Sequence, residues 1–214
     1  MPGELEALID DLHAEAERDR PAAETPDVGI VMGSDSDLDV MMGDGRADTR
    51  SRGAHDALTE LGFAEVTDYD DPPAERFTFE TYVTSAHRTP SLMTAYAETA
   101  ADRGVDVIVA GAGGKSADLP NMVASIAYPV PTIGVPVQEK SVDSVIGMPT
   151  GAPIVAVDAG KSYNAALSAV QILAREHDEL RERLVAAHEG QGDDVAATSR
   201  RLHELGTPGF REQR

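Results

Sequence analysis

The stretch Gly29-Ile-Val-Met-Gly-Ser-Asp-Ser-Asp37 decides the fold. It contains most of an apolar run, Val28 to Met32, that is too short for a helix and includes β-branched residues, so it predicts a buried strand. Gly33 ends this run and can adopt backbone angles that other residues avoid. The residues Ser34 to Asp37 all suit the N-terminus of a helix. The sequence therefore predicts a strand, a glycine turn and a capped helix.

A turn of this kind binds anions, because free backbone N–H groups and the helix dipole face it. Ser34 and Ser36 would add hydroxyl donors. Asp35 and Asp37 would repel a phosphate, but they can accept hydrogen bonds from a sugar hydroxyl or a ring amine. We therefore expect a site for a sugar phosphate that carries polar NH or OH groups. The alternative is an ordinary capped turn without a ligand.

Strand and helix patterns alternate along the rest of the chain. Further strands are expected at residues 77–84, 105–110, 130–135 and 153–157, and helices at 4–18, from 38, 54–61, 91–103, 121–126 and 162–188. An irregular loop is expected at 138–150, and one short helix near 199–205. This alternation favours an α/β fold with a parallel sheet of about five strands, covered by helices on both faces.

The chain divides into a main domain and two extensions. Residues 1–26 read as a helix and a linker, 27–188 as the main domain, and 189–214 as a polar extension. Within the main domain, glycines and mixed charges around 43–75 indicate an acidic insertion.

The chain of 214 residues has a net charge of −20, which argues against nucleic acid as a partner. Its only lysines are Lys115, Lys140 and Lys161. An acidic, lysine-poor surface suits a salt-rich cytoplasm, where salt screens self-repulsion, so we hypothesise a halophilic source. The alternative is an acidic protein from an ordinary cell.

Several classes of protein are excluded or disfavoured by what the sequence lacks. Cysteine is absent, which excludes disulfides and thiolate chemistry. No apolar run approaches the roughly 20 residues of a membrane span, and the acidic N-terminus lacks the apolar segment of a secretory signal. We expect a cytoplasmic protein without membrane contact. His, Asp and Glu show no metal-ligand spacing, so no metal site is predicted.

Three distinctive loops follow predicted strands: Gly33 to Asp37, Ser85 to Pro90, and Gly111 to Leu119. Ligands of parallel α/β sheets bind beyond the carboxyl ends of the strands, so we expect these loops to form one crevice. Arg88 can grip a phosphate or carboxylate with two donors, and His87 can carry a proton near neutral pH.

The segment Ala110-Gly-Ala-Gly-Gly-Lys-Ser116 matches neither the ATP-binding nor the dinucleotide-binding glycine pattern. The first pattern requires glycine where Val109 stands, and the second requires it at Ser116. Its glycines offer a flat surface for a planar ligand, or they allow a helix and a strand to pack closely. Lys115 is a candidate for a functional role, although it could also only screen the surrounding acids.

Six segments, in order, resemble the PurE family of purine biosynthesis. They are Gly33-Ser-Asp-Ser-Asp37, Ser85-Ala-His-Arg-Thr-Pro90, Ala110-Gly-Ala-Gly-Gly114, Gly134-Val-Pro-Val-Gln138, Met148-Pro149 and Asn164-Ala-Ala-Leu167. The resemblance covers about 27–174. It implies a flavodoxin-like three-layer αβα sandwich, a homo-octamer, and no ATP, biotin or metal cofactor.

The resemblance also implies a reaction. One branch of the family is N5-carboxyaminoimidazole ribonucleotide mutase, which converts this substrate to 4-carboxy-5-aminoimidazole ribonucleotide through trapped CO2. The other branch, phosphoribosylaminoimidazole carboxylase, carboxylates aminoimidazole ribonucleotide with free CO2. Ser34, Asp37 and Arg88 would bind the nucleotide, and His87 would lie at the catalytic centre. The wider set of expected substrate contacts is Gly33, Ser36, Ser85, Gly111, Gly113, Gly114 and Ser116.

The chain departs from the mutase pattern in one loop. Mutases usually have Gly-Gly-Ala-Ala-His-Leu-Pro, whereas this chain has Gly113-Gly-Lys-Ser-Ala-Asp-Leu-Pro120, without the His and one residue longer. Lys115 or Asp118 is the expected catalytic substitute. The Lys-Ser pair resembles the carboxylase branch, but the balance of motifs favours the mutase. A binding module without catalysis is the third reading. A synthetase could supply the carboxylated substrate.

Overall fold

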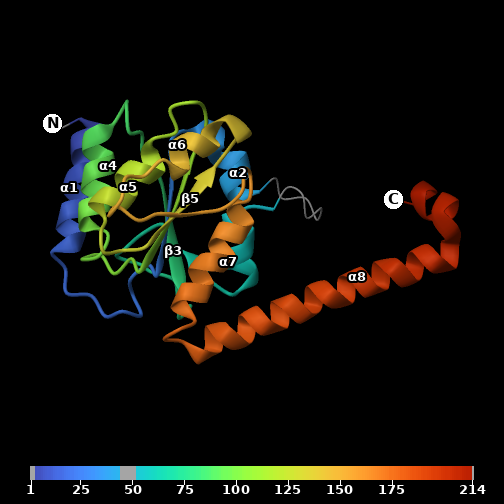
Figure 1. The fold of residues 1–214 in the computed structure, drawn as a ribbon. Coiled ribbons are helices and arrows are strands. Elements are labelled where there is room, and N and C mark those ends of the chain that lie inside the picture. Colours follow the sequence, from blue (N-terminus) through green and yellow to red (C-terminus); the bar gives the residue numbers. More distant parts are fainter. Residues whose placement is uncertain (1–2, 44–51, 214) are drawn as a thin grey trace.

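The computed structural model describes residues 3–43 and 52–213, and it is built around a parallel six-stranded sheet (Figure 1). The strand order is β2-β3-β1-β4-β5-β6. Without the short edge strand β2, this is the order of flavodoxin-like sheets, so the predicted fold class is confirmed. The strands are β1 Val28–Met32, β2 Ala64–Glu65, β3 Thr78–Val83, β4 Val107–Ala112, β5 Thr132–Pro136 and β6 Val155–Ala156.

Helices cover both faces of the sheet, which gives three layers. One face carries α2, α3 and α7, and the other carries α4, α5 and α6, with α1 packed against α4. The bounds are α1 Glu4–Ala16, η1 Asp35–Asp37, α2 Leu38–Met42, α3 Ala54–Glu60, α4 Pro90–Thr99, α5 Leu119–Ile126, η2 Glu139–Ser141, α6 Val142–Ile146, α7 Ser162–Leu173 and α8 Asp178–Glu212.

Strand β1 occupies the centre of the sheet because it is apolar on both faces. Val28, Ile30 and Met32 point to one core and Val31 to the other, and all four are fully buried. Burying such side chains stabilises the fold by roughly 1.5–3 kcal/mol each. β1 pairs with β3 on one side and β4 on the other. The loop that follows β1 therefore lies between the loops that follow its neighbours.

Several local predictions were confirmed and others need correction. Pro90 begins α4, and Gly62 follows α3 with a positive φ of 78°. Strand β2 was missed, because two residues carry no periodic signal. The segment 138–150, predicted as an irregular loop, contains η2 and α6, whose single turns are too short to show helical periodicity. Within the predicted acidic insertion, residues 68–75 form an irregular acidic loop.

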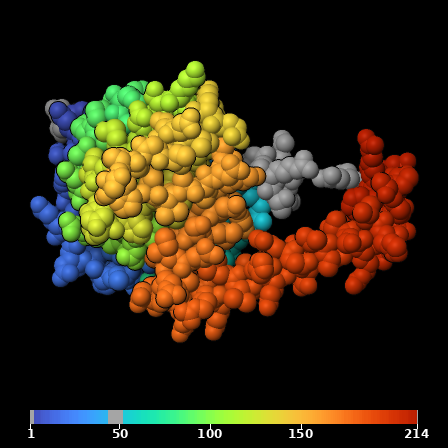
Figure 2. All heavy atoms as spheres, viewed as in Figure 1, coloured from blue at the N-terminus to red at the C-terminus, as the bar shows by residue number. Residues whose placement is uncertain are grey.

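The prediction of one helix over 162–188 was wrong, and the polar extension, predicted to hold only a short helix near 199–205, lies largely within a long helix. Helix α7 ends at Leu173, and α8 runs separately from Asp178 to Glu212. Acidic residues in the first turn of α8 favour a new helix start, because they complement its dipole. α8 projects away from the sheet (Figures 1 and 2) and has non-helical backbone at Gly206.

Of the predicted insertion, residues 44–51 lie outside the described residues. Gly43 and Arg52 flank this segment and form an antiparallel bridge with each other.

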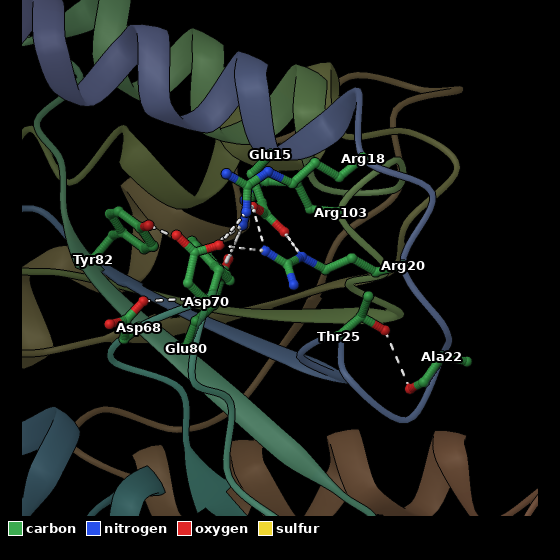
Figure 3. Close-up of polar contacts among 11 residues, drawn as sticks. Glu15, Arg18, Arg20, Ala22, Thr25, Asp68, Asp70, Glu80, Tyr82 and Arg103 are labelled. Carbon is green, nitrogen blue, oxygen red and sulfur yellow. Dashed lines mark hydrogen bonds and ion pairs between the residues drawn. The ribbon is translucent and has the colours of Figure 1, made fainter.

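The N-terminal helix packs against α4 of the main domain. Leu12 is buried beneath α1, and two arginines after the helix tie it to the domain. Arg18 pairs with Asp70 in the acidic loop at 2.5 Å, and Arg20 pairs with Glu15 of the helix and with Asp70 at 3.3 Å (Figure 3).

A buried ion pair joins β3 to the turn that follows α4. Arg103 Nη1 lies 2.6 Å from Glu80 Oε2, and both side chains are almost fully buried. Removing one partner of such a pair costs about 3–5 kcal/mol, because it leaves an uncompensated buried charge. The pair therefore anchors the chain that follows α4 to the middle of β3.

Candidate active site

The three predicted loops lie side by side at one edge of the sheet, because β3, β1 and β4 are neighbours in that order. Backbone hydrogen bonds join them where the strands end. Thr84 N donates to Met32 O at 2.9 Å, and Gly33 N donates to Gly111 O at 3.0 Å. The predicted proximity of the three loops is therefore confirmed, but the hollow at this edge is lined only by residues of β3 and of the loops after β1 and β3.

The loop after β1 begins with a single 3-10 turn rather than directly with an α-helix. Ser34 caps it, with its Oγ accepting from Ser36 N at 3.3 Å and donating to Asp35 Oδ1 at 2.9 Å. Ser36 and Asp35 are exposed, whereas Ser34 is half-buried. The hydroxyl of Ser34 is therefore held at the turn by local contacts.

Asp37 is buried and connects the loop after β1 to the loop after β4. The backbone N–H groups of Gly113 and Ser34 favour the charged form of its carboxylate. Burial raises the pKa of Asp37, while these N–H groups and the charge of Arg88 oppose the rise. A Cβ at Gly113 would lie 2.8 Å from Asp37 Oδ1, so the contact requires glycine there. The structure thus gives Asp37 a role in joining two site loops.

Arg88 bridges the loops after β1 and β3. Its Nη2 donates to Gly33 O at 3.0 Å, and its backbone N donates to Ser85 Oγ at 3.2 Å. This leaves other guanidinium donors for a ligand. The side chain borders a hollow of 340 Å³ at the same edge of the sheet, which is lined by Gly33, Asp35, Val83, Thr84, Ser85, Arg88 and Thr89.

His87 and Asp118 come together from the loops after β3 and β4. His87 Nε2 lies 3.2 Å from Asp118 Oδ2, with side chains 60% and 43% exposed. The other carboxylate oxygen, Oδ1, accepts a hydrogen bond from Ser144 Oγ at 2.7 Å. The pair can exchange a proton with a ligand, because the His remains accessible while the carboxylate orients it.

The glycines of the loop after β4 do not share one role. Gly111 lies within β4, where a Cβ would overlap the Met41 thioether, so it allows α2 to pack on the sheet. Gly114 has a positive φ of 89° and open space around it. Lys115 and Ser116 follow as exposed residues. Of the glycines predicted to form a flat surface for a ligand, Gly113 and Gly114 therefore lie in the loop, whereas Gly111 lies in the strand.

The sequence did not predict roles for Thr84, Thr89 and Ser144. Thr84 Oγ1 is buried and, among the described residues, has no hydrogen-bond partner. Thr89 Oγ1 accepts from Ser85 N at 2.9 Å. Thr84 and Thr89 lie next to or within the predicted loop Ser85 to Pro90. Their position in the sequence is therefore the signal that could have identified them. Ser144 lies in the helix that was predicted as a loop, and nothing in the sequence pattern connects it to Asp118.

Across residues 3–43 and 52–213, no group of three or more His, Asp or Glu side chains is arranged to hold a metal ion. In the same part of the chain, no helix is both long and apolar enough to cross a membrane. A separate hollow of 340 Å³ lies between α1 and the acidic loop, remote from the predicted site residues.

Comparison with known proteins supplies the family. Residues 27–194 match the protein-family model described as AIR carboxylase. The chain belongs to the AIR carboxylase family.

Relatives in this family carry two different names. The N5-carboxyaminoimidazole ribonucleotide mutase of Mycobacterium tuberculosis is 44% identical over 191 residues, which covers 86% of this chain and 95% of that protein. The phosphoribosylaminoimidazole carboxylase of Saccharomyces cerevisiae is 36% identical over 202 residues, which covers 92% of this chain and 31% of that protein.

A solved structure agrees with the fold of this AIR carboxylase family member. Treponema denticola PurE matches with a TM-score of 0.61 at 21% identity, over 82% of this chain and 97% of that one. At that identity, the match supports the fold alone.

Proposed function

We propose that this protein is an N5-carboxyaminoimidazole ribonucleotide mutase of purine biosynthesis. The observation that carries the proposal is the His87–Asp118 pair at 3.2 Å, with Arg88 next to His87 in the same loop. A proton-transfer group and an anion-binding group are the two functions that this reaction needs from the protein. The name and 44% identity of the mycobacterial relative favour the mutase reaction.

The reaction is an isomerisation, so atoms balance without a co-reactant. The bond between the exocyclic nitrogen and the carboxyl carbon breaks, releasing CO2 that stays in the site. The electron-rich C4 carbon of the imidazole attacks this CO2 and forms a carbon–carbon bond. A proton then leaves C4 and another reaches the nitrogen. His87 carries these protons, and holding CO2 beside the ring supplies proximity catalysis.

Asp118 takes the place of the His that mutases of the resembled family usually carry in the glycine-rich loop. It cannot copy the chemistry of an imidazole, but it orients the His87 ring through Nε2. Lys115, exposed in the same loop, faces the carboxylate or CO2 as a positive charge.

The ribonucleotide phosphate binds at the turn after β1, where Ser34, Ser36 and the guanidinium of Arg88 supply donors. The hydroxyl of Ser85 and the backbone of Gly33 complete this part of the site. The aminoimidazole ring lies against Gly113, Gly114 and Ser116. Asp37 contributes by holding the loops that carry these groups, since its own carboxylate is buried between them.

A second candidate function is direct carboxylation of aminoimidazole ribonucleotide with CO2. The observation that favours it is the glycine-rich loop, which contains Lys115-Ser116 and lacks the His. The yeast relative named as a carboxylase matches over most of this chain. Both reactions form the same C4–carboxyl bond and give the same product. They differ only in the source of the CO2.

We infer that the working protein is a homo-octamer whose neighbouring chains help to close the site. The support is exposure: His87 is 60% exposed in a single chain, whereas trapping CO2 requires a pocket that excludes water. Exposed apolar side chains on the same edge, Leu38, Val83 and Ile146, suit burial against another copy. The proposed setting is a salt-rich cytoplasm, with a synthetase as supplier of the carboxylated substrate.

The decisive experiment offers the purified protein two substrates separately at high salt. One is N5-carboxyaminoimidazole ribonucleotide, and the other is aminoimidazole ribonucleotide with CO2 supplied from bicarbonate. Product formation is compared at low CO2, where the carboxylase reaction slows and the mutase reaction does not.

Fast conversion of the first substrate at low CO2 supports the mutase. Efficient use of the second, with a rate that follows the CO2 concentration, assigns the carboxylase instead. Turnover of neither substrate, with nucleotide binding retained in calorimetry, makes the protein a binding module and overturns both catalytic readings.

A further inference from the structure

Ser144 is the one described side chain that hydrogen-bonds to the carboxylate of Asp118 on the side away from His87. Its Oγ donates to Asp118 Oδ1 at 2.7 Å, while Oδ2 lies 3.2 Å from His87 Nε2. The two oxygens of one carboxylate are thus each engaged by a different partner. Ser144 belongs to α6, which is separate from both loops that carry the pair.

Helix α6 is held in place at this edge of the sheet by two further contacts. Val145, next to Ser144, is fully buried, and a Cβ at Gly134 of β5 would lie 2.6 Å from its Cγ1. Glycine at 134 therefore lets α6 approach the sheet. The Nδ2 of Asn121 in α5 donates to the backbone oxygen of Ser144. The hydroxyl of Ser144 thus reaches Asp118 from a fixed backbone.

We propose that Ser144 is a positioning residue that aims the Asp118 carboxylate at His87. The proposal rests on the proposed function, in which His87 transfers the protons. The terminal torsion of an Asp side chain is soft, so a single contact to His87 would leave the carboxylate plane free to turn. A donor on Oδ1 fixes this plane and keeps Oδ2 toward the imidazole.

The proposal predicts an effect on turnover rather than on binding, because Ser144 does not border the hollow beside Arg88. A hydrogen bond to a charged group contributes enough to change a rate by about 10- to 100-fold when it is lost. We expect Ser144→Ala to lower kcat within that range and to leave KM nearly unchanged. Ser144→Thr keeps the hydroxyl and should restore most of kcat.

A double-mutant cycle tests whether Ser144 acts through Asp118. If it does, adding Ser144→Ala to Asp118→Asn should slow the enzyme no further, since the group being positioned has already lost its charge. Multiplied losses in the double variant would overturn the proposal. Ser125→Ala is the matched control, because Ser125 donates to the backbone oxygen of Asn121 on the same side of the domain and does not contact Asp118.

Crystal structures of the Ser144→Ala and Ser125→Ala proteins provide a readout that does not need turnover. In Ser144→Ala, Asp118 Oδ2 should leave hydrogen-bond distance of His87 Nε2 or occupy several rotamers, and in Ser125→Ala it should not move. An unmoved carboxylate in Ser144→Ala overturns the positioning role, whether or not the protein turns over either substrate. Absence of turnover in the parent protein overturns the proposed function alone.

Discussion

His87 and Asp118 lie 3.2 Å apart, Nε2 to Oδ2, although they belong to loops that follow two strands separated by β1. The contact spans the point where the strand order of the sheet reverses, which is where ligands of open α/β sheets bind. Neither residue alone would indicate a catalytic centre. Their meeting at this point is the reason that we propose the pair as the centre of the site.

The charge of Asp118 should matter more for turnover than for binding. Replacing Asp118 with Asn preserves the shape and the hydrogen bond from Ser144, but removes the negative charge that faces His87 Nε2. Steady-state kinetics should show kcat lower by about 100-fold, in the range typical of impaired acid–base catalysis, with KM changed little. An Asp118→Asn enzyme with parental kcat would show that the pair is structural only.

Arg88 should instead control binding of the substrate. In Arg88→Lys the planar fork is lost, and with it both the contact to Gly33 O and the two-pronged grip on phosphate. We expect KM to rise about 10- to 100-fold, with a smaller effect on kcat. Arg175→Lys, an exposed exchange after α7, is the matched control. Equal KM values for Arg88→Lys and the control would contradict the assignment.

The sequence was sufficient for the fold because the main strands carry strong local signals. β1 and β4 are continuous apolar runs that end in glycine-rich turns, and such runs occur where both faces of a sheet are buried. The failures are short or polar elements. β2 has two residues, α6 has five, and α8 lies largely in a polar stretch whose glycines at 190 and 192 disfavour helix.

The sequence could predict those site residues that lie in the loops at the carboxyl ends of the strands. His87, Arg88 and Asp118 could be picked from two loops, because parallel strands bring those loops to one edge. What the sequence could not give is the partner of each group. The burial of Asp37 between Ser34 and Gly113, and the contact from Ser144, depend on how separate elements approach one another in space.

Lys115 should contribute through its charge. If it faces the carboxylate or CO2, Lys115→Ala should lower kcat/KM by roughly tenfold, and Lys115→Arg should retain most of it, since an attraction of about 1 kcal/mol or more between exposed charges is lost only in the first. Lys161→Ala, an exposed lysine at the start of α7, is the control. Normal turnover of Lys115→Ala would leave Asp118 as the single substitute for the missing His.

Asp27 should make the stability of the protein depend on pH. Burial raises its pKa to about 6, although a hydrogen bond from Thr78 N at 2.7 Å opposes the rise. The folded state therefore holds this proton more tightly than the unfolded state, whose Asp pKa is about 3.9, and stability falls as the pH rises from about 4 to about 6.

The expected loss is about 3 kcal/mol of unfolding free energy, and Asp27→Asn should lack it. The measurement is urea denaturation of both proteins at pH 4 and pH 7. Between pH 4 and pH 7, the unfolding free energy of the parent should fall by that amount relative to the unfolding free energy of Asp27→Asn. A difference that is the same at both values would show that Asp27 ionises alike in the folded and unfolded states.

Salt should stabilise this protein by screening its own charge. With a net charge of −20, self-repulsion is strong at 0.1 M salt, where the screening length is about 10 Å, and weak at 1 M, where it is about 3 Å. Tm measured by calorimetry should rise by roughly 5–10 °C between these KCl concentrations, equivalent to about 2–3 kcal/mol at this chain length.

The control for this prediction is the variant Asp193→Asn/Asp194→Asn, which removes two charges from exposed α8 and should show a smaller rise in Tm. A Tm that does not depend on KCl, in a protein fully active in dilute buffer, would remove the case for a salt-rich setting.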